Sequence, residues 1–179
     1  YFGSSTGLSL SGAWFVTSPQ GISYLGVSVS GAGDVNGDGY ADVIVGASGY
    51  DNPESDEGIA QVYNGSPNGL STTSTWNVES NQINALLGYS VSGIGDVNGD
   101  GYADIIVSAK DYDGGDAGEG KAYVYHGSIG GVSSSPAWSA EGNQLNAHFG
   151  VAVSGAGDVN GDGYSDIIVG ANEYDNNET

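Results

Sequence analysis

Short apolar runs separated by glycine-rich turns follow one another along the chain. Residues 25–31 alternate apolar with small polar side chains, and residues 42–47 contain a continuous apolar run of the kind found in a buried strand. Residues 59–63 and 76–78 are two further strand candidates. Apolar residues do not recur at helical spacing over three turns anywhere in the chain. The pattern therefore predicts an all-β protein built from short strands.

This pattern repeats every 62 residues without an insertion or deletion. Three aspartate-rich loops begin at Asp34, Asp96 and Asp158, and each starts 62 residues after the one before it. Three tryptophans and three glycines keep the same spacing: Trp14, Trp76 and Trp138, and Gly26, Gly88 and Gly150. Self-similarity at a fixed period indicates a repeat architecture. We expect one domain of three repeats, spanning approximately residues 1–62, 63–124 and 125–179, with the last repeat incomplete.

Four short strands per repeat, joined by glycine-rich turns, are typical of a β-propeller blade. The sequence predicts four-stranded antiparallel blades, about three of them in this chain. Propellers close with four to eight blades. We therefore expect a partial ring that further blades or other copies of the chain complete, since open sheet edges favour pairing. The chain is expected to begin and end within a repeat: residues 13–17 are predicted as a fourth strand, and the last repeat lacks most of its third strand.

Side-chain size suggests where each strand lies within a blade. Small residues of the first strand, such as Ser28 and Ser30, fit the innermost position, where blades crowd together. The tryptophans fit the outer strand, where they would pack against a neighbouring strand or between blades, since large aromatic side chains bury extensive apolar surface. An aromatic platform for binding sugars is the alternative interpretation of the tryptophans.

The chain is strongly acidic, with 22 Asp and Glu residues against two lysines, and its formal net charge is −20. Such a surface repels phosphate backbones and anionic lipid. We therefore expect no nucleic-acid partner and, since no long apolar segment is present, no membrane insertion. Cysteine is absent, so disulfides do not contribute to stability.

The aspartate-rich loops have the chemistry of a site for a hard cation. In each loop, oxygen-bearing side chains stand at positions 1, 3, 5 and 9, a backbone carbonyl is available at position 7, and two glycines let the chain curl. Ca²⁺ is the expected ion, one per loop and three in all, because it takes six to eight oxygen ligands. The predicted ligands are Asp34, Asn36, Asp38, Tyr40 and Asp42; Asp96, Asn98, Asp100, Tyr102 and Asp104; and Asp158, Asn160, Asp162, Tyr164 and Asp166, with each tyrosine contributing its carbonyl.

Other ions and other motifs fit these loops less well. Mg²⁺ demands a tight octahedron, and Zn²⁺ would need cysteine or recurring histidine ligands. An EF-hand is excluded because position 12 is not glutamate and no helix is predicted on either side. Plain turns stabilised by Asp and Asn side chains are the alternative interpretation. Because cytosolic free Ca²⁺ is too low to fill ordinary loop sites, we expect a secreted or cell-surface, extracellular location.

The order of strands predicts which loops share a face. In an up-and-down blade, the aspartate-rich loops between strands 1 and 2 lie beside the turns between strands 3 and 4, such as residues 65–75. The loops between strands 2 and 3 (residues 48–58, 110–120 and 172–179) and those between repeats lie on the opposite face. These opposite loops differ in sequence among the repeats, whereas the aspartate-rich loops barely differ. We therefore expect an unidentified protein or glycan ligand on the face opposite the calcium loops.

The sequence resembles FG-GAP repeats, the blades of the integrin α-subunit propeller and of many secreted bacterial propellers. The Phe-Gly pair is present as Phe149-Gly150, with Leu25-Gly26 and Leu87-Gly88 as variants, and the calcium loop matches the family pattern in all three copies. The Gly-Ala-Pro element is partly met, for example by Gly31-Ala32-Gly33. The resemblance implies a β-propeller with Ca²⁺ in the hairpins between strands 1 and 2, and, for integrin-like members, ligands on the opposite face.

The sequence favours a calcium-stabilised module for extracellular adhesion or for ligand binding, and not an enzyme. His126 and His148 are the two histidines, and neither lies in a recognisable catalytic arrangement. The carboxylates of Asp111 and Asp113 could form an acid–base pair, but their spacing does not distinguish them from other loop acids. Two alternatives stay open: a structural or assembly segment of a larger secreted protein, and a non-catalytic domain of a secreted hydrolase.

Overall fold

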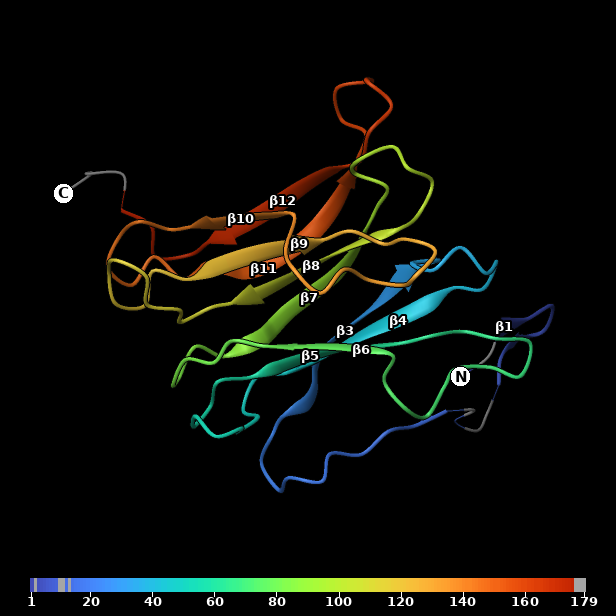
Figure 1. Ribbon diagram of the computed structural model, residues 1–179, viewed down its shortest axis with the longest axis horizontal. Helices are drawn as coiled ribbons and strands as arrows, with labels where there is room; N and C mark the ends of the chain where they lie inside the picture. Colours follow the sequence, from blue (N-terminus) through green and yellow to red (C-terminus); the bar gives the residue numbers. More distant parts are fainter. Residues whose placement is uncertain (2, 10–11, 13, 176–179) are drawn as a thin grey trace.

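The computed structural model describes residues 1, 3–9, 12 and 14–175, and among these residues it contains strands and no helix (Figure 1). This confirms the all-β prediction. The strands are β1 (Gly3–Ser4), β2 (Gly7–Leu8), β3 (Leu25–Gly33), β4 (Asp42–Ala47), β5 (Ile59–Tyr63), β6 (Trp76–Glu79), β7 (Leu87–Gly95), β8 (Asp104–Ala109), β9 (Lys121–Tyr125), β10 (Trp138–Glu141), β11 (Phe149–Gly157) and β12 (Asp166–Ala171).

The strands form two complete four-stranded sheets, one two-stranded sheet and a small hairpin. Their orders are β3-β4-β5-β6, β7-β8-β9-β10, β11-β12 and β1-β2, and every pair is antiparallel. Consecutive strands are neighbours, which is the arrangement of propeller blades. The strands predicted at residues 25–31, 42–47, 59–63 and 76–78 are confirmed. The first strand of each repeat extends two residues further than expected, because it continues through a register shift such as the one between Gly31 and Gly33.

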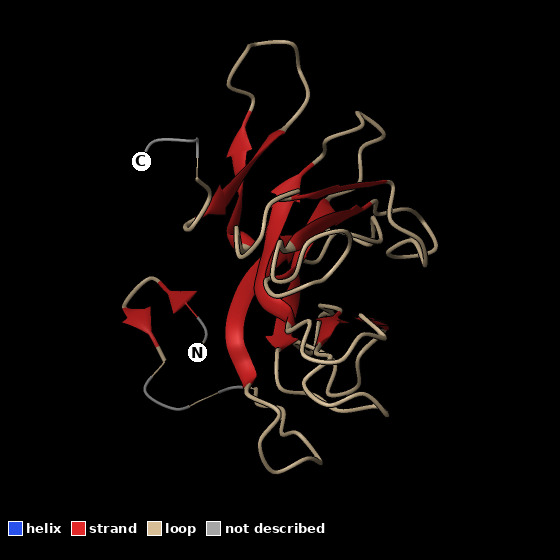
Figure 2. Cartoon of the chain, turned by 90° about the vertical axis from the view of Figure 1, so that its left-hand side faces the viewer, coloured by secondary structure: helices blue, strands red, loops and turns tan. Residues whose placement is uncertain are grey.

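The sheets follow one another in chain order and do not close into a ring (Figures 1 and 2). First strands pack against each other, β3 beside β7 and β7 beside β11. Hydrogen bonds connect these strands: Val91 N–H donates to Ser28 Oγ at 3.0 Å, Gly93 N–H donates to Ser30 Oγ at 3.4 Å, and Val153 N–H donates to Ser90 Oγ at 3.1 Å. The small residues of the first strand therefore lie where sheets meet, as expected.

The core fills the space within and between the sheets. Strands β4 and β8 lie second in their sheets and are almost entirely buried, as their continuous apolar runs predict. Ile44, Val62, Leu87 and Ile105 belong to one buried cluster that spans the first two repeats. The packing between repeats also explains a difference between equivalent valines of β3 and β7. Val91 is buried against the first repeat, whereas among the described residues no sheet packs on the other side of β3, and Val29 is exposed.

The prediction of a fourth strand at residues 13–17 is wrong for residues 14–17, which are not in a strand, while Ala13 lies outside the described residues. A strand needs a hydrogen-bonded neighbour, and among the described residues no strand runs beside this segment. Near the N-terminus the chain instead forms the β1-β2 hairpin (Figure 2), which the hydrophobic pattern did not predict. The proposed repeat boundaries stay a prediction, and the names first, second and third repeat denote the sheets that begin at β3, β7 and β11.

Candidate metal centre

The three aspartate-rich loops connect the first and second strands of each repeat, between β3 and β4, β7 and β8, and β11 and β12. The curl of the first loop depends on glycine, because Gly37 and Gly39 adopt φ values of 72° and 89°, which side chains disfavour. The equivalent glycines of the other loops have similar positive φ values. The three loops therefore share one backbone conformation.

Side-chain oxygens hold each loop in shape by accepting backbone N–H groups. In the first loop, Asp34 accepts hydrogen bonds from the N–H groups of Asp38 and Gly39 at 3.0 and 2.8 Å. Asn36 Oδ1 accepts from Asp38 N–H at 3.0 Å, and Asp38 Oδ1 accepts from Tyr40 N–H at 2.9 Å. The other two loops repeat this network. The turn chemistry named as the alternative interpretation is thus present, and it leaves further lone pairs on each oxygen.

The carboxylate at loop position 9 is buried in the first two repeats. Asp42 and Asp104 are fully inaccessible to solvent. Asp42 Oδ2 accepts Val35 N–H at 3.0 Å, and its Oδ1 accepts Gly65 N–H at 2.8 Å. Asp104 makes the same two contacts in the second repeat, and Asp166 keeps the loop contact in the third. In the first two repeats this aspartate therefore ties the loop to the segment just after the third strand of its own sheet.

The charged forms of the buried carboxylates are electrostatically unfavourable without a nearby positive charge. Burial raises the pKa of Asp42, and the nearby charges of Asp38 and Asp34 raise it further against the two N–H bonds. Burial likewise raises the pKa of Asp104. At loop position 1 the direction is opposite: the N–H of Gly163 and three neighbouring N–H groups hold the pKa of Asp158 below its usual range. The first two loops thus gather negative charge around a carboxylate that burial disfavours in its charged form.

The donor chemistry of the loops fits a hard cation. The predicted ligands at positions 1, 3, 5 and 9 all carry oxygen, and an ion would offset the repulsion that raises the pKa of Asp42. The acids are not preassembled around a point, since within the described ranges no three Asp, Glu or His groups stand close enough to hold an ion. The Asn36 side chain, for example, donates from Nδ2 to Asp38 Oδ2 at 2.9 Å. The structure therefore supports the donor set without showing a coordination geometry.

The loops between strands 2 and 3 lie at the other ends of the strands, on the face opposite the aspartate-rich loops (Figure 1). Each is held by a glutamine that sequence reasoning missed. The Gln82 side chain donates to the carbonyl of Asp113 at 2.8 Å and accepts its N–H at 2.7 Å. Gln20 and Gln144 make the same pair of bonds to Asp51 and Asp175. The 62-residue spacing of the three glutamines was the signal that could have found them.

The carboxylates considered as an acid–base pair have separate structural contacts. Asp111 Oδ1 lies 2.6 Å from Lys110 Nζ and 2.7 Å from His148 Nδ1. Asp113 Oδ1 accepts the N–H of Gly118 at 2.6 Å, which closes its own loop. Both side chains therefore have contacts that account for their positions within the loops.

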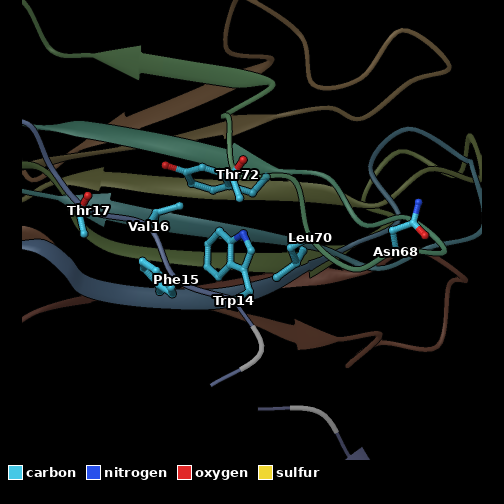
Figure 3. Close-up of a pocket in the computed structure, with 8 residues that line it drawn as sticks. Trp14, Phe15, Val16, Thr17, Asn68, Leu70 and Thr72 are labelled. Carbon is cyan, nitrogen blue, oxygen red and sulfur yellow. The ribbon is translucent and has the colours of Figure 1, made fainter. Parts of the chain in front are cut away.

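Trp14 and Trp76 pack between repeats, as predicted. Trp14 meets Tyr63 edge to face at a ring distance of 5.2 Å and donates from Nε1 to the carbonyl of Ser71 at 2.7 Å. Trp76 makes the equivalent contacts to the second repeat, with Tyr125 at 4.9 Å and the carbonyl of Ser133 at 2.9 Å. A groove of about 590 Å³ lies beside Trp14 and is lined by residues 14–17 and by Tyr63, Asn68, Leu70 and Thr72 (Figure 3).

Within the part of the chain that the structure describes, no helix has the length and apolarity needed to cross a membrane.

Comparison with known proteins identifies the repeat. The model of the FG-GAP repeat family matches residues 25–63, 87–125 and 149–179. Integrin alpha-PS2 of Drosophila melanogaster is 35% identical over 173 residues, which cover 89% of this chain and 12% of that protein. Integrin alpha-IIb of Mus musculus is 36% identical over 160 residues, or 85% of this chain and 15% of that protein. Integrin alpha-6 of Gallus gallus is 35% identical over 145 residues, or 77% and 12%.

The chain thus spans about an eighth of the length of the integrin α subunits that it matches. The three matched segments begin at residues 25, 87 and 149, each at the first residue of a sheet's first strand. Family matches, repeat spacing and antiparallel sheets agree with one another. The chain therefore belongs to the FG-GAP repeat family, as an integrin-α-like module of β-propeller blades.

Proposed function

We propose that this chain is a calcium-dependent module for adhesion or ligand binding on the extracellular side of cells, and not an enzyme. In this proposal each aspartate-rich loop binds one Ca²⁺ through its oxygens at positions 1, 3, 5 and 9 and the carbonyl at position 7. A protein or glycan ligand binds on the opposite face. Family membership and the integrin α relatives support the adhesive role.

The observation that carries the proposal is the buried aspartate at loop position 9. Asp42 and Asp104 are fully buried beside other carboxylates, and neither has a Lys, Arg or His ion pair in the described structure. A buried charge without a compensating charge is costly. Bound Ca²⁺ supplies the missing positive charge, so ion binding contributes directly to the free energy of folding.

The position-9 aspartate also explains how one ion could stabilise a whole repeat. Its two oxygens already bond the loop at Val35 and the segment after strand β5 at Gly65. Stabilising its charged form strengthens the connection between the hairpin and the rest of the sheet. The ion is then a structural element, and ligand discrimination belongs to the opposite loops, whose sequences differ among repeats.

Removal of Ca²⁺ tests the proposal. Excess chelator should lower the melting temperature, and added Ca²⁺ should restore it. A single site at a Ca²⁺ concentration 100-fold above its Kd stabilises by about 2.7 kcal/mol, which corresponds to roughly 5–10 °C for a chain of this size. In the same samples, binding to arrayed glycans and extracellular-matrix proteins should occur in Ca²⁺ and be lost in chelator.

Two variants make the result specific to the loops. The triple variant Asp38→Ala, Asp100→Ala, Asp162→Ala should lose most of the melting shift caused by Ca²⁺, while the single variant Asp116→Ala, an exposed acid of another loop, should keep it. An unchanged melting curve in chelator would contradict the calcium proposal. A calcium-dependent melting shift without binding to any arrayed ligand would instead support a structural segment of a larger protein.

A further inference from the structure

A glutamate is buried at the same position in the second-to-third-strand loops of the first two repeats. Glu57 and Glu119 are 0% and 1% exposed. In both, Oε2 accepts a backbone N–H from the loop that leads to the next repeat, donated by Asn81 and Asn143 respectively at 3.1 Å. The two glutamates therefore occupy equivalent positions in their repeats, and the residues around one can be compared with those around the other.

The other carboxylate oxygen is satisfied in the second repeat and not in the first. Glu119 Oε1 accepts hydrogen bonds from the N–H groups of Gly114 and Gly115 at 2.6 and 2.7 Å. Residues Asn52 and Pro53 stand 62 positions earlier, and proline has no N–H to donate. Glu57 Oε1 is buried without a hydrogen-bond partner. Burial raises the pKa of Glu57, and the nearby Asn52 N–H opposes this rise without meeting hydrogen-bond geometry.

The second repeat also has a lysine that the first repeat lacks. Lys121 lies directly across β9 and β10 from Glu141, and its Nζ is 2.7 Å from Glu141 Oε1. This pair is adjacent to the buried glutamate, since a Cβ added at Gly114 would collide with both Glu119 Oε1 and Glu141 Oε2. In the first repeat, Ile59 stands opposite Glu79 across β5 and β6. The Ile59 side chain is too short to place a group where the ammonium lies, and it carries no charge.

Three carboxylates therefore surround this position in the first repeat. After burial, the charges of Glu79 and Glu54 are the next causes that raise the pKa of Glu57. Glu54 Oε2 is also buried without a hydrogen-bond partner, and Glu79 Oε2 accepts Asn52 Nδ2 at 3.0 Å. None of the three glutamates forms an ion pair with a described lysine or histidine. A buried, unpartnered carboxylate oxygen beside two more carboxylates is costly unless a cation binds there.

We propose that the second-to-third-strand loop of the first repeat binds one Ca²⁺-type divalent cation between Glu57, Glu54 and Glu79, replacing the Lys121 ammonium of the second repeat. The donors are oxygens, which hard divalent cations prefer. A divalent ion suits this loop because Glu54 is a partly buried third carboxylate, whereas its counterpart Asp116 is exposed. Glu54 and Glu79 turn toward the ion on binding, since the described acids are not preassembled around a point.

This cation would connect the first repeat to the second. Glu57 already bonds Asn81 through its side chain, and its carbonyl accepts the N–H of Leu87, the first residue of β7. Glu79 ends strand β6. An ion shared by these carboxylates fastens the loop to the outer strand and to the start of the next sheet. It lies on the face opposite the aspartate-rich loops, so it does not depend on whether those loops bind metal.

Exchanging the isoleucine and the lysine between repeats tests the proposal. Ca²⁺ bound per chain is measured by equilibrium dialysis at millimolar Ca²⁺ for the 179-residue chain and its variants. Ile59→Lys should bind one Ca²⁺ fewer than the unmodified chain, because the new ammonium occupies the site. Lys121→Ile removes the ammonium from the second repeat and leaves the first-repeat site intact. This variant should therefore bind at least as many Ca²⁺ ions as the unmodified chain.

The difference between Ile59→Lys and the unmodified chain is the decisive measurement. It should be one ion whether the aspartate-rich loops bind three ions or none, so failure of this proposal and failure of the calcium-loop proposal give different results. An equal number of bound ions in a folded Ile59→Lys chain overturns the proposal. If that variant does not fold, the double variant Glu54→Gln, Glu79→Gln replaces it; one ion fewer supports the site, and an unchanged number overturns it.

Discussion

The glycine of each Leu-Gly or Phe-Gly pair occupies a backbone bulge. Gly26, Gly88 and Gly150 have φ values of 88°, 82° and 92°. In the first sheet the register shifts between Leu25 and Ser28, across this glycine. A side chain is disfavoured at such φ values. The backbone conformation therefore explains why the family motif has glycine at this position in every repeat.

Gly26 and Gly88 allow strain and crowding to be separated. A Cβ at Gly26 would meet nothing within 4 Å, whereas one at Gly88 would collide with the carbonyl oxygen of Ile59 in the preceding repeat. Gly26→Ala should lower the free energy of unfolding by about 1–2 kcal/mol through backbone strain alone. Gly88→Ala should lower it by about 3 kcal/mol or more, because a repeat must also move. Urea denaturation measures both, and equal losses would show that the contact between repeats does not matter.

A tryptophan contact between repeats connects strand β6 to strand β9. Trp76 opens β6, the outer strand of the first sheet, and its indole reaches Tyr125 at the end of β9 and the carbonyl of Ser133 in the following loop. Trp14 makes the same contact with the first repeat without belonging to a strand. The contact therefore depends on the side chain and not on strand pairing.

Removing the indole N–H tests this contact. Trp76→Phe keeps an aromatic ring but loses the hydrogen bond to Ser133 and part of the packing, and should lower the free energy of unfolding by about 1–2 kcal/mol. Trp138 is 42% exposed and serves as the matched control, since Trp138→Phe should change the value by less than about 0.5 kcal/mol. Chemical denaturation gives both values. A larger loss in the control would contradict the role assigned to Trp76.

Strands and repeats could be predicted from the sequence because local features encode them. The run Val43-Ile44-Val45 predicts a buried strand, and a 62-residue period without insertions predicts equivalent sheets. Contacts between segments far apart in the chain could not be predicted this way. The bonds of Gln82 to Asp113 and the burial of Glu57 depend on loops from different repeats meeting. Residues 14–17 were wrongly predicted because strand formation needs a neighbour as well as a pattern.

For the candidate metal site too, local features could be predicted from the sequence, whereas long-range contacts could not. Its donor residues could be predicted from loop spacing, and they stay a prediction. The sequence did not indicate that Asp42 and Asp104 would be buried and bonded to glycines 23 residues later. Nor did it distinguish the loop at Glu57 from the loop at Glu119, although Ile59 and Lys121 stand at equivalent positions. Those differences become meaningful when the cross-strand registers are known.

The molecule as a whole depends on buried tyrosines that must stay protonated. Burial raises the pKa of Tyr125 to about 12. Burial, followed by the charges of Tyr112, Tyr125 and Glu141, raises the pKa of Tyr123 well above its usual range. Both residues lie on β9, within the second sheet. Their ionisation and global unfolding are therefore coupled.

Alkaline pH should destabilise the whole chain through these tyrosines. A folded-state pKa above the unfolded value means that the stabilising contribution is complete below about pH 10 and is lost as pH rises toward 12. The free energy of unfolding, measured by urea denaturation across this range, should fall with pH. The fall should be smaller in Tyr125→Phe and unchanged in Tyr174→Phe, whose ring is exposed. An identical fall in Tyr125→Phe would contradict the assignment.

The tryptophan contact sets a time order for folding during synthesis. The indoles of Trp14 and Trp76 each donate a hydrogen bond to a carbonyl 57 residues further along the chain. At a ribosomal rate of about 5–20 residues per second, the acceptor of an indole is made roughly 3–11 s after the indole itself. A nascent repeat therefore emerges with its outer aromatic side chain uncovered until its successor has been translated. The interval exposes each new edge to the solvent and to chaperones, and every added repeat shields the one before it.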